Sequence, residues 1–271
     1  MRKQNGRTLL RRLPIFFLII GSSLVGTPLA TASSKRPPKY DHVVMVIMEN
    51  HSFKSISQAR AATYLNRLAK GGALFTHSFG VTHPSQPNYL ALFSGSTHGI
   101  TDDGWHQVAA PNLATSLSAA DKTFLGYVEA GSPRKHNPWE SFANGMKFEA
   151  PLNELPRDYT KLPSVSFVIP NLKNDMHNGT IKQADRWLKS HLAGYARWAM
   201  SNNSLLIVTF DEDDYDAKNR IFTVFYGFGV EPGLYSERID HYTILRTIED
   251  IASVPLLGKS AARKVIRSSW K

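Results

Sequence analysis

Apolar runs along this chain end abruptly in groups of polar residues. Each run is short, rich in branched side chains and not alternating, which is typical of a strand buried on both faces of a parallel sheet. Ligands of open α/β sheets bind beyond the carboxyl ends of such strands, so the polar groups should converge on one crevice. Three runs behave in this way: residues 43–48 precede Glu49 and Asn50, residues 164–169 precede Asn171, Asp175 and His177, and residues 205–210 precede Asp211, Glu212, Asp213 and Asp214.

Strand-like and helical patterns alternate through the rest of the chain, which favours an α/β fold in one domain. The further strands are expected at residues 124–128 and 221–226. Helices are expected at residues 59–70, 87–93, 183–200 and 241–251. The domain should span residues 41–271, after a polar, Pro-containing lead-in at residues 33–40.

The first 32 residues have the pattern of a secretory signal peptide. A basic leader precedes a largely apolar stretch at residues 15–25, and Ala30-Thr31-Ala32 offers a small-residue cleavage site. The apolar stretch is short and broken by Gly21, so a membrane span is the weaker interpretation. Arg11-Arg12 leaves twin-arginine export open as a minority alternative to the general route. The mature protein is therefore expected to be secreted or periplasmic, without a stable membrane anchor.

Composition limits the partners and the chemistry. Loss of the five positive charges of the leader would lower the formal net charge from +10 to +5, a mildly basic balance that suits anionic substrates. There is no Lys/Arg-rich helix or interleaved aromatic motif, so no nucleic acid partner is predicted. Cysteine is absent, so any metal must be held by oxygen and imidazole ligands.

Ser85 is the best candidate for a nucleophile. It lies in His83-Pro84-Ser85-Gln86-Pro87, where Pro87 suits the first turn of the helix expected at residues 87–93. Free N–H groups and the positive end of the helix dipole at such a position stabilise an anion, so a phosphoryl group could be received there. A serine before a helix is more often a simple cap, and the segment alone does not decide between the two.

The carboxylates that follow two of the strands predict a metal site near Ser85. Glu49, Asn50, Asp211 and Glu212 offer the hard oxygen ligands that bind a divalent cation. A cation beside Ser85 would stabilise its alkoxide and neutralise a bound phosphoryl group. The alternative for Asp211–Asp214 is a solvated acidic turn.

Three histidines have polar, loop-like neighbours close to a strand end or a helix start, and each could bind a phosphoryl oxygen, protonate a leaving group or ligate a metal. They are His136, His177 and His241. His83 stays undecided. Five others are expected to be structural, namely His51, His77, His98, His106 and His191.

Four segments, in this order, resemble the phosphoesterase family of bacterial acid phosphatases and phospholipases C. The resemblance implies the fold of the alkaline phosphatase superfamily, a central and mostly parallel sheet with helices on both faces. It also implies a metal-assisted Ser or Thr nucleophile and a covalent phosphoryl-enzyme. The segments are Val46-Ile47-Met48-Glu49-Asn50-His51-Ser52-Phe53, His83-Pro84-Ser85-Gln86-Pro87-Asn88-Tyr89, Arg134-Lys135-His136-Asn137-Pro138 and Phe210-Asp211-Glu212-Asp213-Asp214, and the match continues through residues 241–250.

The resemblance assigns roles residue by residue. Glu49 with Asn50 and Asp211 with Glu212 match the metal-binding pairs, and Ser85 matches the nucleophile that shares the ion. His136, His177 and His241 would bind substrate, with His136 and His177 also catalytic. Asn88 matches an asparagine that holds phosphoryl oxygens in nucleotide pyrophosphatases. Asp175, His177 and His241 come in the order in which relatives with two metal ions place the ligands of the second ion. The acid phosphatase branch of the family binds a single metal ion.

Two departures from the family pattern bear on specificity. Lys54 stands where family members usually carry Asp, which would alter charge near the entrance of the site. The chain is also much shorter than the large phospholipases, so lipid specificity does not follow from the family name.

The sequence thus predicts an exported, metal-dependent phosphoesterase, acid phosphatase or phospholipase C-like, that hydrolyses phosphate esters through a phosphoserine. The alternative is a non-catalytic exported protein that binds phosphorylated or anionic ligands. A serine esterase is disfavoured because no Gly-x-Ser-x-Gly elbow surrounds Ser85. The identity of the divalent metal ion, the choice among monoester, diester and phospholipid, the pH optimum and the oligomeric state stay open.

Overall fold

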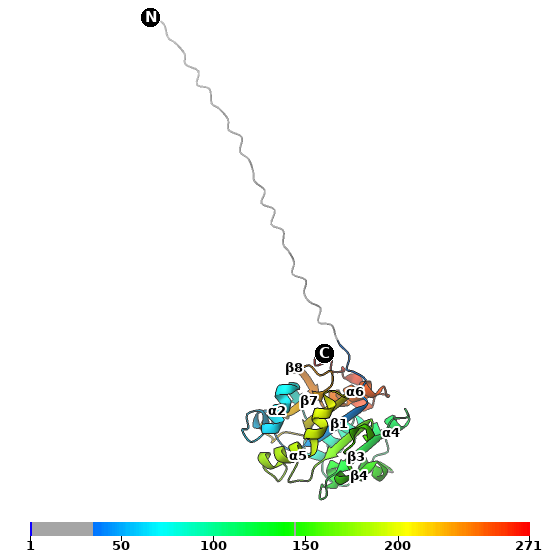
Figure 1. The fold of residues 1–271 in the computed structure, drawn as a ribbon. Helices are drawn as coiled ribbons and strands as arrows, with labels where there is room; N and C mark the ends of the chain where they lie inside the picture. Colours follow the sequence, from blue (N-terminus) through cyan, green and yellow to red (C-terminus); the bar gives the residue numbers. More distant parts are fainter. Residues whose placement is uncertain (2–34, 144) are drawn as a thin grey trace. The chain divides into compact units, whose positions relative to one another are not determined.

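A mixed sheet in the order β4-β3-β5-β1-β6-β7-β2-β8 organises the part of the chain that the computed structural model describes, residues 35–143 and 145–271 together with Met1 (Figure 1). The signal peptide expected at residues 1–32 lies outside these residues, apart from Met1. The strands are β1 His42–Met48, β2 Ala73–Phe79, β3 Phe124–Val128, β4 Glu149–Pro151, β5 Val165–Ile169, β6 Ser204–Phe210, β7 Arg220–Gly227 and β8 Gly233–Asp240.

The described helices comprise six α-helices and several short 3-10 turns. The α-helices are α1 Phe53–Ser57, α2 Thr63–Gly71, α3 Ser85–Ser94, α4 Leu113–Ser118, α5 Ile181–Ala199 and α6 His241–Ala252. The 3-10 turns are η1 Arg134–His136, η2 Pro138–Ser141, η3 Gly145–Phe148, η4 Leu152–Glu154, η5 Tyr159–Lys161 and η6 Gly258–Ala262. No described helix has both the length and the apolar character needed to cross a lipid bilayer.

The sheet is mostly parallel, as predicted. Strands β4, β3, β5, β1 and β6 pair in parallel, and β7 alone among the described strands runs against its neighbours. The last residues of β1 and β6, Met48 and Phe210, are directly paired. The residues that follow them therefore leave the same edge of the sheet side by side.

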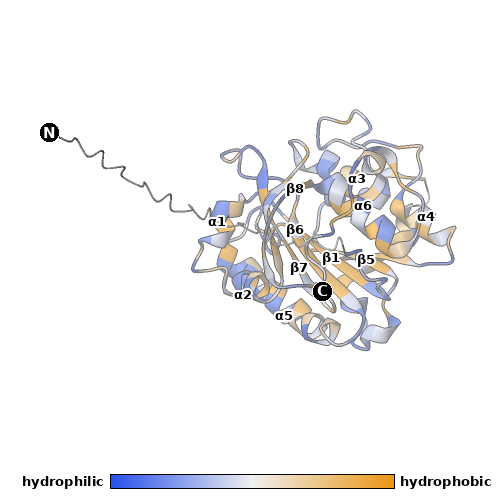
Figure 2. Ribbon diagram, turned by 90° about the horizontal axis from the view of Figure 1, so that it is seen from above, coloured by the Kyte–Doolittle hydropathy of each residue, from blue (hydrophilic) through white to orange (hydrophobic). Residues whose placement is uncertain are grey.

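Alternation of side chains along β1 explains why the strand is apolar throughout. Val43, Met45 and Ile47 join one hydrophobic cluster, and Val44, Val46 and Met48 join the other. Helices α3, α4 and α6 contribute to the first cluster, and α1, α2 and α5 to the second. Figure 2 shows these two groups of helices on opposite sides of the sheet. Successive side chains point to opposite faces of a strand, so both faces of β1 are buried.

The predicted elements are present with small shifts at their ends. The helix expected from residue 59 begins at Thr63, because residues 59–62 form a turn closed by the Ala62 N–H and the Ala59 carbonyl. Strands β2 and β8 were not expected. The side chains of β8 alternate between exposed and partly buried at the sheet edge, and polar residues interrupt β2 at Thr76, His77 and Ser78, so neither has the pattern of an internal strand. The predicted domain boundaries stay a prediction.

Helix α2 depends on a cap from another helix. Its own N-cap residue, Ala62, has no side chain that can accept a hydrogen bond from the first turn. Asp185 of α5 does so instead, since its carboxylate accepts hydrogen bonds from Tyr64 N at 2.8 Å, Leu65 N at 2.9 Å and the Thr63 hydroxyl at 2.9 Å. The negative charge also lies at the positive end of the α2 dipole. This contact joins the two helices on the face of the sheet opposite α3.

Replacing Asp185 with Ala should lower the free energy of unfolding by about 3 kcal/mol, because the buried Tyr64 and Leu65 N–H groups would lose their acceptor. Chemical denaturation measures this loss. Asp185→Asn, which keeps an acceptor oxygen, should cost less. Equal stability of the Ala variant and the unmodified protein would contradict this account of α2.

Candidate active site

Three neighbouring parallel strands deliver carboxylates to one edge of the sheet. Glu49 follows β1 and Asp211 follows β6, and both side chains are fully buried. Asp175 lies in the loop after β5 and is also fully buried. The loop is fixed to the end of β1 because the Glu49 N–H donates to the Asp175 carbonyl at 2.8 Å. The predicted convergence of polar groups at the strand ends is therefore present in the structure.

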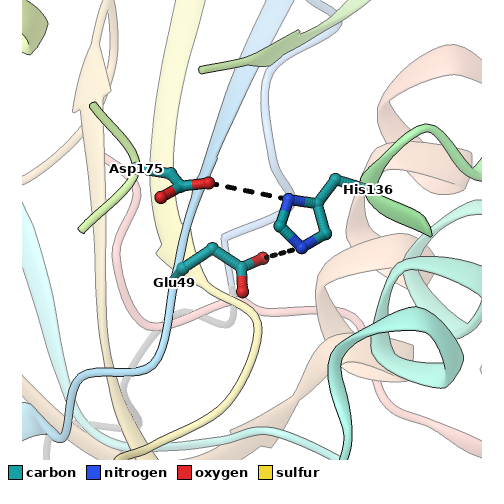
Figure 3. A group of neighbouring side chains, drawn as sticks. All are labelled: Glu49, His136 and Asp175. Carbon is teal, nitrogen blue, oxygen red and sulfur yellow. Dashed lines mark ion pairs between the residues drawn. The ribbon is translucent and has the colours of Figure 1, made fainter. Parts of the chain in front are cut away.

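Glu49, His136 and Asp175 form a buried group that can hold a metal ion, with one ligand atom of each within 4.8 Å of the others. Figure 3 shows the imidazole of His136 facing both carboxylates, with one ring nitrogen directed at each. His136 Nε2 lies 3.3 Å from Glu49 Oε1, and Nδ1 lies 3.6 Å from Asp175 Oδ2. The group combines residues that the sequence assigned to two different metal sites, because Glu49 was expected in the first site and Asp175 in a possible second one.

His136 is held neutral, the form in which imidazole binds metals. Burial, and then the charges of Lys135 and His177, keep its pKa well below the ordinary histidine value. Its ring stacks on Tyr89, with the centroids 4.9 Å apart and the planes 9° from parallel. A neutral ring beside two carboxylates offers a lone pair to a cation.

The buried carboxyl groups resist ionisation. Burial, reinforced by the charges of Asp211 and Asp175, raises the pKa of Glu49 well above its ordinary value. Burial likewise raises the pKa of Asp175 to about 8 and of Asp211 to about 7. Burial and the charge of Asp211 raise the pKa of Glu212 to about 9. Like charges in a low-dielectric site cannot all ionise without a compensating cation.

Several buried polar atoms at this edge have no hydrogen-bond partner among the described residues. They are Asn50 Oδ1, Asp175 Oδ2, Asp211 Oδ2 and both ring nitrogens of His136. Buried polar atoms are almost always satisfied, so a set of unpaired polar atoms needs an explanation. A divalent cation fits this donor set, because carboxylate, amide and imidazole ligands without thiolate suit such ions.

Ser85 is the first residue of α3 and contacts the carboxylates directly. Its hydroxyl donates to Glu49 Oε2 at 3.1 Å, and its presence beside Asp211 opposes the rise in the pKa of that carboxyl. The side chain is only 2% exposed. The structure thus brings together the predicted nucleophile and acidic groups remote in the chain, at the start of a ten-residue helix.

Asn88 is already engaged in hydrogen bonds. Its Oδ1 accepts from Val81 N at 3.0 Å and Thr82 N at 3.1 Å, and its Nδ2 donates to the Thr82 carbonyl at 2.8 Å. Nδ2 also lies 3.3 Å from Glu212 Oε2. Asn88 therefore holds the loop that precedes Ser85, and the phosphoryl-binding role implied by the resemblance stays a prediction.

Glu212 lies apart from the group of Glu49, His136 and Asp175. His83, which the sequence left undecided, bridges two acids, with Nδ1 2.9 Å from Glu212 Oε2 and Nε2 3.2 Å from Asp213 Oδ1. Asp213 is buried and accepts hydrogen bonds from three backbone N–H groups of residues 215–219, so the acidic run is mostly not a solvated turn. Lys54 is exposed and lines a cavity with Asp214 and Asp216.

His177 and His241 differ in their exposure to solvent. The His177 ring is partly exposed and its centroid lies 6.2 Å from that of His136, while its backbone N–H donates to Asp175 Oδ1 at 2.7 Å. His241 is fully buried with Nε2 3.0 Å from the Phe210 carbonyl, and burial lowers its pKa to about 4. The second metal set expected from Asp175, His177 and His241 is not brought together as one group, since only Asp175 joins a described metal-binding group.

Tyr89, Lys135 and Asp103 contribute to the site but were not predicted. The Tyr89 hydroxyl donates to Glu49 Oε1, opposite the oxygen that Ser85 contacts. Lys135 forms an ion pair with Asp103, which also accepts from Gln86 N at 2.9 Å. Tyr89 lies four residues after Ser85 in a helix, a spacing that puts both side chains on one face and could have identified it. Asp103 has no such signal, because it lies in a loop.

The fold matches solved structures of the alkaline phosphatase superfamily. A protein of that superfamily from Vibrio parahaemolyticus aligns with a TM-score of 0.61 at 12% identity, over 86% of this chain and 72% of that chain. The C-terminal periplasmic domain of EcEptC from Escherichia coli, solved in complex with Zn, aligns with a TM-score of 0.59 at 10% identity, over 87% of this chain and 91% of that chain. At such low identity these matches show the fold, and the predicted fold class is confirmed.

Comparison of sequences then defines the family. The phosphoesterase family model matches residues 55–255. A phosphatidylinositol-3-phosphatase of Mycobacterium tuberculosis is 42% identical over 93% of this chain and 90% of its own length, and a phosphate-repressible acid phosphatase of Penicillium chrysogenum is 28% identical over 94% and 69%. The chain belongs to the phosphoesterase family. Its predicted class, a hydrolase of phosphate ester bonds, is confirmed.

Replacing Tyr89 with Phe should weaken metal binding by about tenfold or more, because loss of a partner that orients a ligand typically costs that much. Titration of the chelator-treated protein with a divalent metal measures the change. Tyr195→Phe is the matched control, since the Tyr195 hydroxyl is buried in α5 and donates to the Leu205 carbonyl on the other face of the sheet. Equal metal affinities in both variants would exclude Tyr89 as a supporting residue.

Metal binding should release protons, and metal affinity should rise with pH between about 6 and 9. The reason is that metal-free Asp211 and Asp175, whose pKa values are raised to about 7 and 8, are largely protonated at pH 6 and must ionise to ligate. By the same linkage, the metal-free fold loses stability as pH rises through this range, because the unfolded carboxyls have already lost their protons. Calorimetry in two buffers of different ionisation enthalpy counts the protons. A pH-independent affinity without proton release would contradict these shifts.

Proposed function

We propose that this protein is an exported, metal-dependent phosphatase in which Ser85 attacks phosphorus and forms a phosphoserine. The observation that carries the proposal is the contact of the Ser85 hydroxyl with Glu49, itself part of the buried group with His136 and Asp175. A serine placed so, at the start of a helix and against a group suited to a cation, is equipped for phosphoryl transfer rather than for capping.

The side chains around Ser85 have different roles in the proposed reaction. Glu49 orients the hydroxyl by accepting its hydrogen bond, and the first turn of α3 directs its positive dipole end at the phosphoryl group. A divalent cation held by Glu49, His136, Asp175 and Asp211 would supply charge neutralisation and a lowered pKa for the hydroxyl. The geometry favours a ligand role for His136 over the phosphate-binding role implied by the resemblance.

The reaction takes two displacements at phosphorus. The Ser85 hydroxyl passes its proton to Glu49, its hydrogen-bond acceptor, and its oxygen forms a bond to phosphorus as the bond to the leaving alkoxide breaks. The alkoxide takes up a proton. Water then attacks the phosphoserine, releasing phosphate and restoring the hydroxyl. His177 is the donor of the proton to the alkoxide in this proposal, because its ring is accessible to solvent and lies beside His136.

Phosphate monoesters are the proposed substrates. Relatives that align over most of this chain are named acid phosphatases and a phosphatidylinositol-3-phosphatase, and the latter shares 42% of aligned residues. The proposed substrate class is therefore a monoester on a bulky alcohol, with the 3-phosphate of a phosphoinositide headgroup as its leading member. The pattern of residues 1–32 supports export.

Replacing Ser85 with Ala should lower kcat by at least about a thousandfold while the melting temperature and the bound metal stay unchanged, because a nucleophile is removed and no ligand oxygen is lost from the carboxylates. Ser94→Ala, the matched change at the other end of α3, should keep near-normal turnover. The substrates are a chromogenic phosphomonoester, the corresponding diester and a soluble inositol 3-phosphate.

Near-normal hydrolysis by the Ser85→Ala protein, with contamination excluded, would remove Ser85 from the mechanism. Ligand binding without product across all three substrates would instead favour the non-catalytic binding protein. A preference for the diester would overturn the monoester assignment and leave the nucleophile in place.

A further inference from the structure

Lys135 and Asp103 form a sheltered ion pair at the edge of the site. Lys135 Nζ lies 2.7 Å from Asp103 Oδ2, and the two side chains are 18% and 32% exposed. By contrast, the ion pair of Lys161 with Asp158 is 3.8 Å long and 74% and 56% exposed. Exposed pairs contribute little, whereas a short and partly desolvated pair holds its members in one geometry.

The charge of Lys135 acts on the buried carboxylates. It lowers the pKa of Glu49, Asp175 and Glu212, against the larger effect of burial. Burial opposes the charge of Lys135 itself, but the hydrogen bond and charge of Asp103, together with Glu49 and Asp211, outweigh it and raise the pKa of Lys135. Lys135 is therefore a fixed positive charge next to the site, adjacent in sequence to the buried His136.

Asp103 connects this charge to the nucleophile helix. While Oδ2 accepts from Lys135, Oδ1 accepts from the N–H of Gln86, the residue after Ser85. Arg134 fixes the loop that carries Asp103, since its Nη2 donates to the Gly104 carbonyl and to Gln86 Oε1, both at 2.6 Å. The ammonium group of Lys135 is thus set in position relative to Ser85 by one carboxylate.

A transferred phosphoryl group brings negative charge to an edge of the sheet that already holds several carboxylates, and a single divalent cation would leave an excess of negative charge. We propose that Lys135 binds an oxygen of the phosphoryl group during transfer and that Asp103 is the positioning residue that aims it. This inference rests on the proposed function, because it assigns the phosphoryl group to Ser85. It adds a binding residue from η1 to which the resemblance to the family assigned no role.

Binding of inorganic phosphate to the metal-loaded Ser85→Ala protein tests the role of Lys135 without turnover. Adding Lys135→Met should weaken phosphate binding by about 10- to 100-fold, the effect of losing a charge-assisted hydrogen bond. Lys135→Arg should recover most of the affinity. Lys161→Met is the matched control and should leave the affinity unchanged. Calorimetry gives the affinities, and elemental analysis verifies equal metal content.

Asp103→Asn separates the effect of Asp103 on Lys135 from its effect on helix α3. The amide keeps an acceptor oxygen for the Gln86 N–H but loses the negative charge that holds Lys135. It should weaken phosphate binding several-fold with Lys135 present and have no further effect in the Lys135→Met background. Asp102→Asn, an adjacent change at an exposed residue paired with His106, should have no effect. If the Lys135→Met protein fails to fold, the phosphate affinities of the Asp103→Asn and Asp102→Asn proteins are compared instead, and only Asp103→Asn should weaken binding.

Phosphate affinity within twofold of the parent in Lys135→Met would overturn the proposal for Lys135. Equal losses from Asp103→Asn in both backgrounds would show that Asp103 does not act through Lys135. In the otherwise unmodified enzyme, Lys135→Met should raise KM more than it lowers kcat. Failure of the Ser85 mechanism can be distinguished from failure of the Lys135 proposal. The first would appear as turnover by the Ser85→Ala protein, whereas the phosphate titrations alone decide the role of Lys135.

Discussion

Burial of several carboxylates at one edge of the sheet is the constraint on which the site depends. Glu49, Asp175 and Asp211 are fully buried and adjacent, and burial raises the pKa of each. A folded chain tolerates such a cluster only if the acids hold protons or share a cation. The folding of this edge and the chemistry that it supports are therefore coupled, because the cation that would activate Ser85 is also what would make the ionised cluster stable.

Strand direction makes this cluster possible. Strands β5, β1 and β6 are parallel neighbours, so the residues that follow them meet at one edge, and the pairing of Met48 with Phe210 sets Glu49 level with Asp211. Helix α3 completes the arrangement from the face of Val43, Met45 and Ile47. All ten residues of α3 are buried, so the position of Ser85 is set by packing along the whole helix.

Sequence pattern predicted five of the eight described strands and the polar residues that follow three of them, but it did not predict how the ligands group. Glu49, Asp211 and Ser85 lie directly at an element end, where periodicity places them. Asp175 and His136 lie in a loop and a 3-10 turn, and their approach to Glu49 depends on tertiary contacts such as the hydrogen bond from Glu49 N to the Asp175 carbonyl. No local period encodes contacts of that kind, and the same holds for Asp103.

The apolar faces of the sheet and its carboxylate edge contribute differently to stability, which explains how the buried carboxylates are tolerated. The face with α2 and α5 is closed by a second apolar cluster and by the cap from Asp185, so it contributes stability through apolar packing and a helix cap. The edge at which Glu49, Asp175 and Asp211 meet carries unpaired polar atoms and raised carboxyl pKa values. Stability gained by packing on the sheet can offset the cost of burying these groups, because β1 contributes to both apolar clusters and ends directly before Glu49. The site therefore depends on the complete sheet and not only on the edge with the carboxylates.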